Sequence, residues 1–379
     1  MAFEIPLYKS FHTAQDAKAV AAVIERGMGW ADGEEIGRFE KNLCEYTGRK
    51  YAAAFSSGTS ALHAMLLACG IGRGDEVIVP SFTFISTANS VLFCGAKPVF
   101  ADIERQTLGL DAKDVEKRIT QKTKAIMPIH YAGCPASQIE SLRELANKRG
   151  LPLLEDNAES LGASIDGRKT GTFGEAAMLS FCANKIITCG EGGAVLTDSQ
   201  KIYKQMRLLR SHGRAEGDYF GSSRTLDYVE LGYNYRMPTM CAALADSQLG
   251  GIERIVRMRR EVARAYRERL AGIDGVGLLP DNGRLRNIYQ LFTIILPSRN
   301  ERDGLRARLE KAGVQSKVYF EPAHATHFYR QVQKDASELP ATEEMSGRVL
   351  SLPMFVGLSP AEIETICDEI EKFMKHTKG

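Results

Sequence analysis

One lysine, Lys185, lies in a sequence context that could make it a nucleophile rather than a surface charge. It follows a short apolar run (177–181) and precedes a turn rich in glycine (190–193). A lysine in such a tight, non-helical segment is poorly placed for full solvation. Desolvation favours the neutral amine, which can attack an aldehyde and form a Schiff base. The alternative is that Lys185 is an ordinary surface charge, as most lysines are.

A second segment, 56–62, combines small residues with a predicted helix start. Backbone N–H groups and the positive end of the helix dipole at such a start suit a phosphate. Gly58 permits close backbone approach, and Thr59 and Ser60 can add hydroxyl groups. The same residues also suit a simple helix N-cap, where Ser and Thr are preferred. The segment is not a Walker loop, because the chain contains no GxxxxGK[ST] motif.

A third candidate, Asp156, directly follows an apolar predicted strand (152–155). A carboxylate at that depth needs a partner. A protonated pyridine nitrogen would be such a partner, and the ring could then accept electrons from a carbanion, as pyridoxal phosphate does. The alternative is that Asp156 caps the next helix.

The elements that must position these residues form an alternating pattern between residues 50 and 200. Apolar runs of four to six residues alternate with amphipathic stretches, and they predict strands at 51–55, 76–80, 98–102, 125–129, 152–155, 177–181 and 194–197. Helical patterns reach to Cys69 and Phe93 and cover 137–149. The pattern predicts an α/β domain with a mostly parallel sheet covered on both faces. Ligands of such sheets lie beyond the carboxyl ends of the strands.

The second half of the chain has a different pattern. Residues 240–270 predict one or two long, charged helices that leave the first domain. A strand at 290–296 and helices at 301–312 and 360–376 predict a smaller α+β domain. We therefore expect a large domain at 1–250 and a small C-terminal domain at 251–379.

The order of the three candidates, phosphate turn, Asp156 and then Lys185, is that of fold-type I pyridoxal enzymes. Over essentially its whole length the chain resembles the DegT/DnrJ/EryC1/StrS family of sugar aminotransferases. The matching segments include Ser-Gly-Thr-Ser-Ala-Leu at 57–62 and Glu-Asp-Asn-Ala-Glu-Ser at 155–160. The others are 39–40, 74–84, 95–100, 128–131, 180–185, 190–193, 232–237 and 351–354.

The resemblance implies the aspartate-aminotransferase fold, pyridoxal 5'-phosphate as cofactor, and a role for each matching residue. Lys185 would form the Schiff base and move protons, and Asp156 would bond the pyridine nitrogen. Phe84 would stack on the cofactor ring. The cofactor phosphate would be held by Gly58, Thr59 and Ser180. Asn234 would reach the phosphate of the neighbouring subunit, so the resemblance implies a homodimer with shared active sites.

Some positions depart from the commonest family pattern. Glu159 replaces Gln, which is similar to the perosamine-synthase-like branch, and it would lie near the 3-hydroxyl of the cofactor. His324 matches a position near the substrate, although residues 318–320 before it are Val-Tyr-Phe instead of the usual His-Tyr-Pro. Lys185 is present where related dehydratases have His, which favours a transaminase.

The implied activity is transfer of an amino group from L-glutamate to a nucleotide-activated 4-keto-6-deoxy sugar, with GDP-4-keto-6-deoxymannose as first candidate. Such a product would serve cell-surface polysaccharide or glycan synthesis. Two alternatives remain open: a transaminase for a 3-keto sugar or cyclic ketose, and a non-catalytic binding protein that keeps the fold.

The composition indicates which classes of partner and which cellular compartment to expect. With 49 basic and 47 acidic side chains the net charge is +2, which gives no reason to expect nucleic acid or a membrane surface. The eight cysteines form no CxxC pair, so we expect no metal site and a reducing compartment. The N-terminus lacks the pattern of a signal peptide, and no apolar run approaches the ~18 residues of a spanning helix. We therefore expect a cytoplasmic protein.

Overall fold

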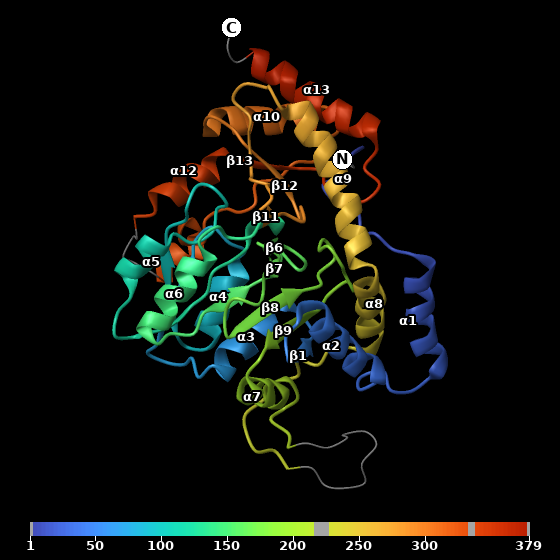
Figure 1. Cartoon of the computed structure of the whole chain (residues 1–379), viewed down its shortest axis with the longest axis vertical. Coiled ribbons are helices and arrows are strands. Elements are labelled where there is room, and N and C mark those ends of the chain that lie inside the picture. Colours follow the sequence, from blue (N-terminus) through green and yellow to red (C-terminus); the bar gives the residue numbers. More distant parts are fainter. Residues whose placement is uncertain (1–2, 216–226, 333–337, 377–379) are drawn as a thin grey trace.

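The computed structural model describes residues 3–215, 227–332 and 338–376. Its larger part, in the lower half of Figure 1, is built around a twisted sheet. The strands are β1 (Tyr51–Phe55), β2 (Glu76–Pro80), β3 (Lys97–Ala101), β4 (Thr123–Ile126), β5 (Leu154–Asp156), β8 (Ala176–Ser180) and β9 (Gly193–Thr197). Hydrogen bonds link them as β1-β9-β8-β5 and β3-β2-β4. Two parallel bridges, Ile126 to Leu153 and Ile129 to Asp156, join these two groups into one sheet.

The directions of the strands determine which strand ends lie together at one edge of the sheet. Strand β9 pairs antiparallel with both β1 and β8, whereas β5 with β8, β2 with β3 and β2 with β4 are parallel pairs. The other strands therefore share one direction, and their carboxyl ends lie at the same edge. The predicted mostly parallel sheet is confirmed. The reversed direction of β9 was not predicted, because a buried antiparallel strand has the same apolar run as a parallel one.

Both faces of the sheet are buried, and the alternation of side chains along β1 shows how. Ala53 and Phe55 belong to a core shared with helices α3 (Gly58–Ala68) and α4 (Ile85–Phe93). Ala52 and Ala54 face the opposite core, formed with α2 (Glu34–Thr47) and α8 (Thr239–Gly250). Successive residues of a strand point to opposite faces, so such a strand must be apolar throughout.

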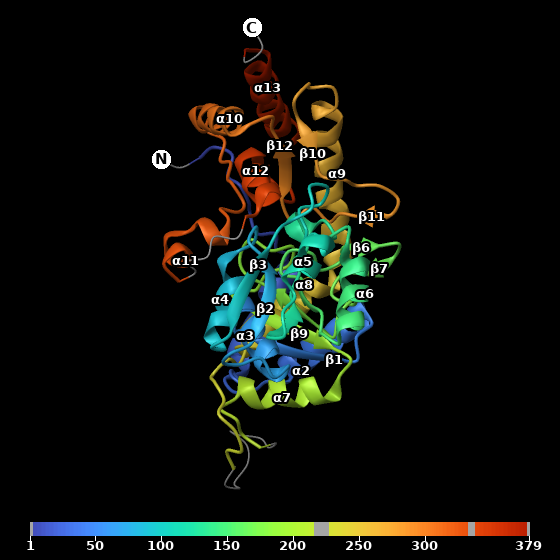
Figure 2. The same ribbon diagram turned by 90° about the vertical axis from the view of Figure 1, so that its left-hand side faces the viewer.

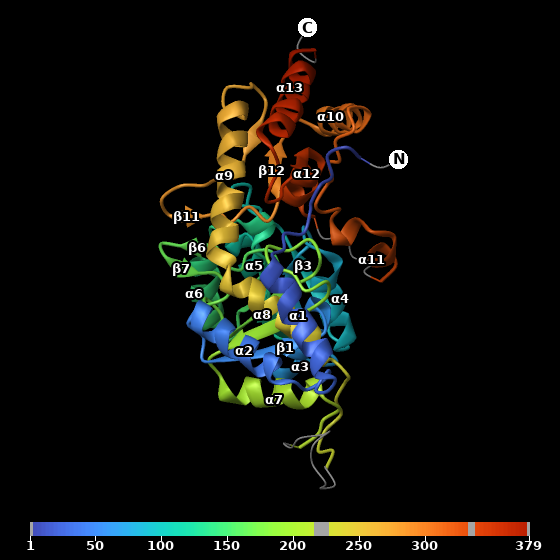
Figure 3. The same cartoon turned by 90° about the vertical axis from the view of Figure 1, so that its right-hand side faces the viewer.

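Further helices complete the two layers. Helix α7 (Gln200–Arg210) packs beside α3, and α1 (Ala14–Arg26) packs outside α8, as Figure 3 shows. Helices α5 (Ala112–Arg118) and α6 (Ile139–Arg149) cover the side of β2, β3 and β4. A short turn of 3-10 helix, η1 (Tyr131–Gly133), follows β4. The small sheet β11-β6-β7, at Leu285–Arg286, Ser164–Ile165 and Arg168–Lys169, lies above the main sheet.

The predicted helical stretch 240–270 consists of two helices separated at Gly251, α8 and α9 (Ile252–Leu270). Only α9 has the predicted charged character, because α8 contains a single charged residue, Asp246. The first turns of α9 pack into the core of the large sheet, while Tyr266 and Leu270 pack into the C-terminal core. Helix α9 therefore joins the two cores, and the division at residues 250 and 251 stays a prediction.

The C-terminal part has its own antiparallel sheet and core, in the upper half of Figure 2. The sheet is β10-β12-β13, at Gly277–Leu278, Phe292–Ile295 and Val349–Leu352. Its helices are α10 (Arg299–Lys311), η2 (Ala323–Ala325), α11 (His327–Val332), α12 (Pro340–Arg348) and α13 (Pro360–His376). The N-terminal segment joins this part, since Ile5 forms a parallel bridge with Val314.

Candidate active site

A cavity of about 580 Å³ lies at the edge of the sheet where the parallel strands end. Seven of the residues predicted for the site line it: Gly58, Thr59, Phe84, Asp156, Glu159, Ser180 and Lys185. Gly58, Thr59, Asp156 and Lys185 were predicted from local patterns, and Phe84, Glu159 and Ser180 from the family resemblance. The structure brings together residues that are up to 127 positions apart (185 − 58). A larger cavity of about 1040 Å³, between α2 and α7, contains none of the predicted site residues.

The predicted phosphate turn forms the start of α3. Ser57 is the N-cap residue, and its hydroxyl accepts a hydrogen bond from the backbone N–H of Ser60 at 3.1 Å. The Ser60 hydroxyl in turn accepts from the backbone N–H of Ser57 at 3.0 Å. The N-cap interpretation is therefore correct for Ser57, and it does not compete with the phosphate hypothesis. The cap fixes the helix start, so the N–H groups of Gly58 and Thr59 are held at the cavity wall.

Gly58 lies against Ser180, the last residue of β8. A Cβ atom at Gly58 would be 3.1 Å from Cβ and 3.2 Å from Oγ of Ser180. A side chain would therefore crowd the hydroxyl that lines the cavity. The close approach explains why this helix begins with glycine despite the low helix propensity of that residue.

Asp156 ends β5 and is almost fully buried, with 6% of its surface exposed. Its carboxylate accepts hydrogen bonds from Oγ1 of Thr87 at 2.8 Å and from the N–H of Ala158 at 3.2 Å. Burial raises the pKa of Asp156, and the hydrogen bonds from Thr87 and Ala158 oppose that rise. No helix follows β5 in this described stretch, since the chain turns into β6, so Asp156 is not a helix cap. A buried carboxylate of this kind favours a cationic ligand group.

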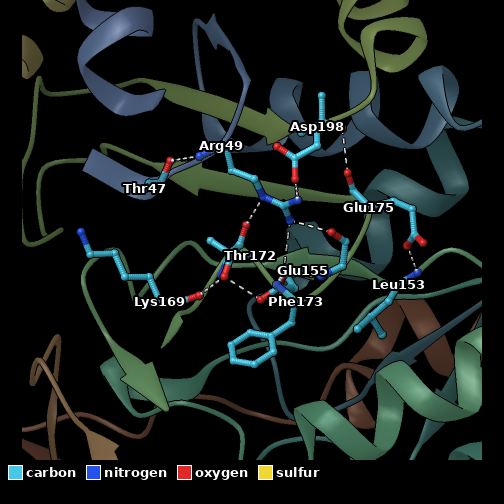
Figure 4. A network of polar contacts seen from close by, with 12 residues as sticks. Thr47, Arg49, Leu153, Glu155, Lys169, Thr172, Phe173, Glu175 and Asp198 are labelled. Carbon is cyan, nitrogen blue, oxygen red and sulfur yellow. Dashed lines mark hydrogen bonds and ion pairs between the residues drawn. The ribbon is translucent and has the colours of Figure 1, made fainter. Parts of the chain in front are cut away.

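The residue before it, Glu155, belongs to a polar network with Arg49 and Phe173 (Figure 4). Its carboxylate accepts hydrogen bonds from the N–H groups of Gly171, Phe173 and Gly174 and contacts Nε2 of His130 at 3.0 Å. Burial alone would raise the pKa of Glu155, but these donors lower it below its usual value. The fixed position of Glu155 holds the backbone from which Asp156 reaches the cavity.

Lys185 lies in a loop that folds back on the end of β8. The N–H of Phe181 donates to the carbonyl of Gly192, and the N–H of Lys185 donates to the carbonyl of Cys182, both at 2.9 Å. The Lys185 side chain is only 14% exposed, and its Nζ lies 3.5 Å from Oε1 of Glu159. The alternative of a solvated surface lysine is therefore excluded by its position.

Glu159 is itself held in place. Its second oxygen, Oε2, accepts a hydrogen bond from the N–H of Ala132 at 2.8 Å. Ala132 has a left-handed backbone (φ 59°), which turns its N–H toward the carboxylate. One oxygen is thus anchored while the other faces Lys185.

Two aromatic side chains, Phe84 and Phe320, line part of the cavity. Phe84, at the N-cap of α4, is 59% exposed and offers a free ring face. The ring of Phe320 lies 6.1 Å from it, centroid to centroid. An exposed aromatic ring beside a buried carboxylate suits a flat, cationic ring system.

Three predicted residues do not line this cavity: Ser60, His324 and Asn234. The Ser60 hydroxyl serves the cap of α3. Nδ1 of His324 contacts Oγ of Ser81 at 2.6 Å, and its Nε2 lies 3.6 Å from Oε1 of Glu343. Burial lowers the pKa of His324. Asn234 is exposed, forms a bridge with Ser211 and is absent from the cavity lining. Within the described chain, neither His324 nor Asn234 meets Lys185.

Sequence reasoning missed several residues that line the cavity, namely Tyr8, Thr87, His130, Glu191, Lys317, Tyr319 and Phe320. Thr87 had a local signal, because polar residues in the first turn of a predicted helix lie beside the strand end. Tyr319 had a signal in the resemblance, because it matches the Tyr of the family's His-Tyr-Pro segment. Tyr8 and Lys317 had none, since they come from remote segments.

The site fits the expected pyridoxal 5'-phosphate. It provides a helix start with a glycine for the phosphate, a buried carboxylate for the pyridine nitrogen and an enclosed lysine for the aldehyde. Among the described residues no group of three or more His, Cys, Asp or Glu has the arrangement of a metal site. In the same described ranges, no helix has the length and apolar character needed to cross a membrane.

Two curated enzymes are similar in sequence to nearly the whole chain. It is 37% identical to GDP-perosamine synthase of Vibrio cholerae over 371 residues, which is 97% of this chain and 99% of that protein. It is 33% identical to GDP-perosamine synthase of Escherichia coli O157:H7 over 369 residues, with 97% and 98% coverage.

Solved structures give the same fold. PseC of Helicobacter pylori, an aminotransferase of pseudoaminic acid biosynthesis, has a TM-score of 0.91 at 29% identity and covers 99% of this chain and 100% of its own. The PLP-form of Spr1654 from Streptococcus pneumoniae, a sugar aminotransferase by description, has a TM-score of 0.91 at 25% identity, with 98% and 99% coverage. These neighbours confirm the predicted fold type I. The model of the DegT/DnrJ/EryC1/StrS aminotransferase family matches residues 11–371, and the chain belongs to that family.

Proposed function

We propose that the chain is an aminotransferase that moves an amino group from L-glutamate to a nucleotide-activated 4-keto-6-deoxy sugar. The proposal rests on one observation: Asp156, Lys185 and the capped start of α3 all line the same cavity. The two curated relatives support the sugar class and make GDP-4-keto-6-deoxymannose the first candidate. They favour it over a 3-keto sugar, a cyclic ketose or a non-catalytic binding protein.

The cofactor is pyridoxal 5'-phosphate, as in the family and in the PLP-form neighbour. When bound, it supplies an aldehyde that accepts the amine and a ring that withdraws electrons. Asp156 would keep a proton on the ring nitrogen, because its buried carboxylate gains from a cationic partner. Gly58, Thr59 and Ser180 would bind the phosphate, and Phe84 would cover one face of the ring.

Lys185 would carry protons in both half-reactions. Its Nζ would remove a proton from the α-carbon of glutamate in the first half and return one to the sugar carbon in the second. Glu159 would keep Nζ in place, since its anchored carboxylate lies 3.5 Å away. The Lys185 side chain is mostly enclosed, which would limit exchange of this proton with water.

We further propose that the active unit is a homodimer in which Asn234 reaches the cofactor phosphate of the partner. Asn234 is exposed, and the nearby side chains of Tyr228, Val229 and Leu231 are 57% to 79% exposed. Apolar side chains exposed in one segment are typical of an interface. We also propose a cytoplasmic location, because all eight cysteines are free thiols, as a reducing compartment would keep them.

A two-stage assay tests the function. Purified protein with pyridoxal phosphate is mixed with L-glutamate, and the loss of the cofactor's visible absorbance reports the first half-reaction. Each candidate keto sugar nucleotide is then added, and mass spectrometry detects the aminated product. We expect product with GDP-4-keto-6-deoxymannose. Product only with a 3-keto sugar would overturn the substrate class, and no amination of any candidate would overturn the function.

A further inference from the structure

The active-site cavity contains more negative than positive side chains. Asp156, Glu159 and Glu191 carry the negative charges, and Lys185 and Lys317 carry the positive ones. Both substrates of the proposed reaction are anionic, because glutamate has two carboxylates and a nucleotide sugar has a diphosphate. A cation that faces either substrate would therefore favour its binding.

Lys185 cannot serve as that cation throughout the reaction. Its Nζ is enclosed beside Glu159 at 3.5 Å, and the proposed function uses it to carry protons. Lys317 is different, since its side chain is exposed and, in the described residues, its Nζ forms no ion pair. It is the remaining cation on the cavity wall of the described chain.

The backbone aims Lys317 at the cavity. Its N–H donates to the carbonyl of Ser351 at 3.1 Å and its carbonyl accepts from the N–H of Ser351 at 2.8 Å, so residue 317 is held as an extra strand position beside β13. In such a strand, residues 317 and 319 point to the same face. Lys317 and Tyr319 both line the cavity, and Tyr319 also packs with Val318 against a neighbouring hydrophobic core.

Tyr319 fixes the position of the ammonium group. The Nζ of Lys317 lies 4.8 Å from the centroid of the Tyr319 ring. A ring face attracts a cation without neutralising it, so the charge stays available to a ligand. An ordinary surface lysine would have neither this orienting ring nor a place in the cavity wall.

We propose that Lys317 binds an anionic group of the substrate and so determines which substrates enter the site. The inference rests on the proposed function, because that function supplies the anionic substrates. The shared chemistry is a carboxylate or phosphate oxygen that accepts from the ammonium group. Two sources have this chemistry: a carboxylate of glutamate and the diphosphate of the nucleotide sugar.

Direct binding measurements distinguish the sources without turnover. Calorimetric titrations of the protein loaded with pyridoxal phosphate use GDP as the diphosphate probe. Glutarate, which has the carboxylates of glutamate but no amine, is the other probe. The variants are Lys317→Ala, Lys317→Arg and the control Lys148→Ala, which removes an exposed lysine from α6, outside the cavity.

We expect Lys317→Ala to weaken binding of GDP, glutarate or both by about tenfold to a hundredfold, as expected for one hydrogen bond to a charged group. Lys317→Arg should restore most of the affinity, and Lys148→Ala should have no effect. Cofactor affinity should stay unchanged in all three variants, because Lys317 is not among the proposed cofactor ligands.

Each outcome has a distinct meaning. Weakening for GDP alone assigns Lys317 to the diphosphate, and weakening for glutarate alone assigns it to the amino donor. Equal affinities in wild type and Lys317→Ala, or no binding of either probe to the wild type, would overturn the proposal. A protein that binds GDP through Lys317 but transfers no amino group would refute the proposed function and leave this assignment standing.

Discussion

Replacing Asp156 with asparagine tests two effects of its buried carboxylate. One is the loss of folding stability from burying the charge, and the other is the gain in cofactor affinity. The substitution Asp156→Asn keeps the shape of the side chain. Thr87 and Ala158 donate to different oxygens of the carboxylate, so the single amide oxygen can keep the bond from Ala158 while the amide NH2 donates to Oγ1 of Thr87. What it removes is the negative charge opposite the proposed pyridine nitrogen. A hydrogen bond to a charged group contributes roughly 1.5 to 3 kcal/mol, so cofactor affinity should fall about 10- to 150-fold.

The same substitution should stabilise the protein without cofactor. Burial raises the pKa of Asp156 above its ordinary value of 3.8. For a carboxyl with a raised folded pKa, the contribution to stability is fully present below the unfolded pKa and is lost as the pH rises through the folded pKa. At pH 7 the wild type is therefore destabilised by a buried charge that Asp156→Asn lacks. The difference in unfolding free energy between the two proteins should shrink as the pH falls.

Two measurements check this prediction on the same samples. Protein freed of cofactor is titrated with pyridoxal phosphate, and absorbance gives the dissociation constant. Thermal unfolding of the cofactor-free protein from pH 5 to 8 gives the stability difference. Asp156→Ser, which shortens the side chain and removes the charge, serves as a second variant. An unchanged cofactor affinity together with a lower Tm at pH 7 would refute the reasoning.

Two further substitutions test the site wall and the connection between the cores. Gly58→Ala places a Cβ 3.1 Å from Cβ of Ser180. Overpacking of this kind costs about 1 to 3 kcal/mol, so cofactor binding should weaken at least about fivefold. An unchanged dissociation constant in a cofactor titration would contradict this. Arg259→Leu removes a buried guanidinium that donates to the carbonyls of Tyr289, Gln290 and Met354. Three unpaired carbonyls should lower the free energy of unfolding in urea by roughly 3 kcal/mol or more, and a loss below about 1 kcal/mol would show that water replaces the bonds.

The residues that follow strand ends could be predicted from the sequence alone. Asp156 is the last residue of β5, Gly58 comes shortly after β1, and Lys185 comes shortly after β8. A local pattern was sufficient there, because strands of one direction bring their carboxyl ends to the same edge. The family resemblance added Phe84 and Ser180, which also line the cavity.

Contacts set by the packing of remote segments could not be predicted. Tyr8 reaches the cavity because the N–H of Leu7 donates to the side chain of Gln315 and the carbonyl of Leu7 accepts from Met354. No periodic pattern near Tyr8 encodes this pairing. For His324, a match to a family position does not reveal the contact of its ring with Ser81, and its place near the substrate stays a prediction.

The central claim is that Lys185 is the residue that bonds the cofactor aldehyde. Protein incubated with pyridoxal phosphate is treated with borohydride, digested, and mapped by mass spectrometry. The account predicts one stoichiometric cofactor adduct, on the peptide that contains Lys185, and loss of that adduct and of the absorbance band in Lys185→Ala. A stoichiometric adduct on another lysine, or full amino transfer by Lys185→Ala, would contradict it.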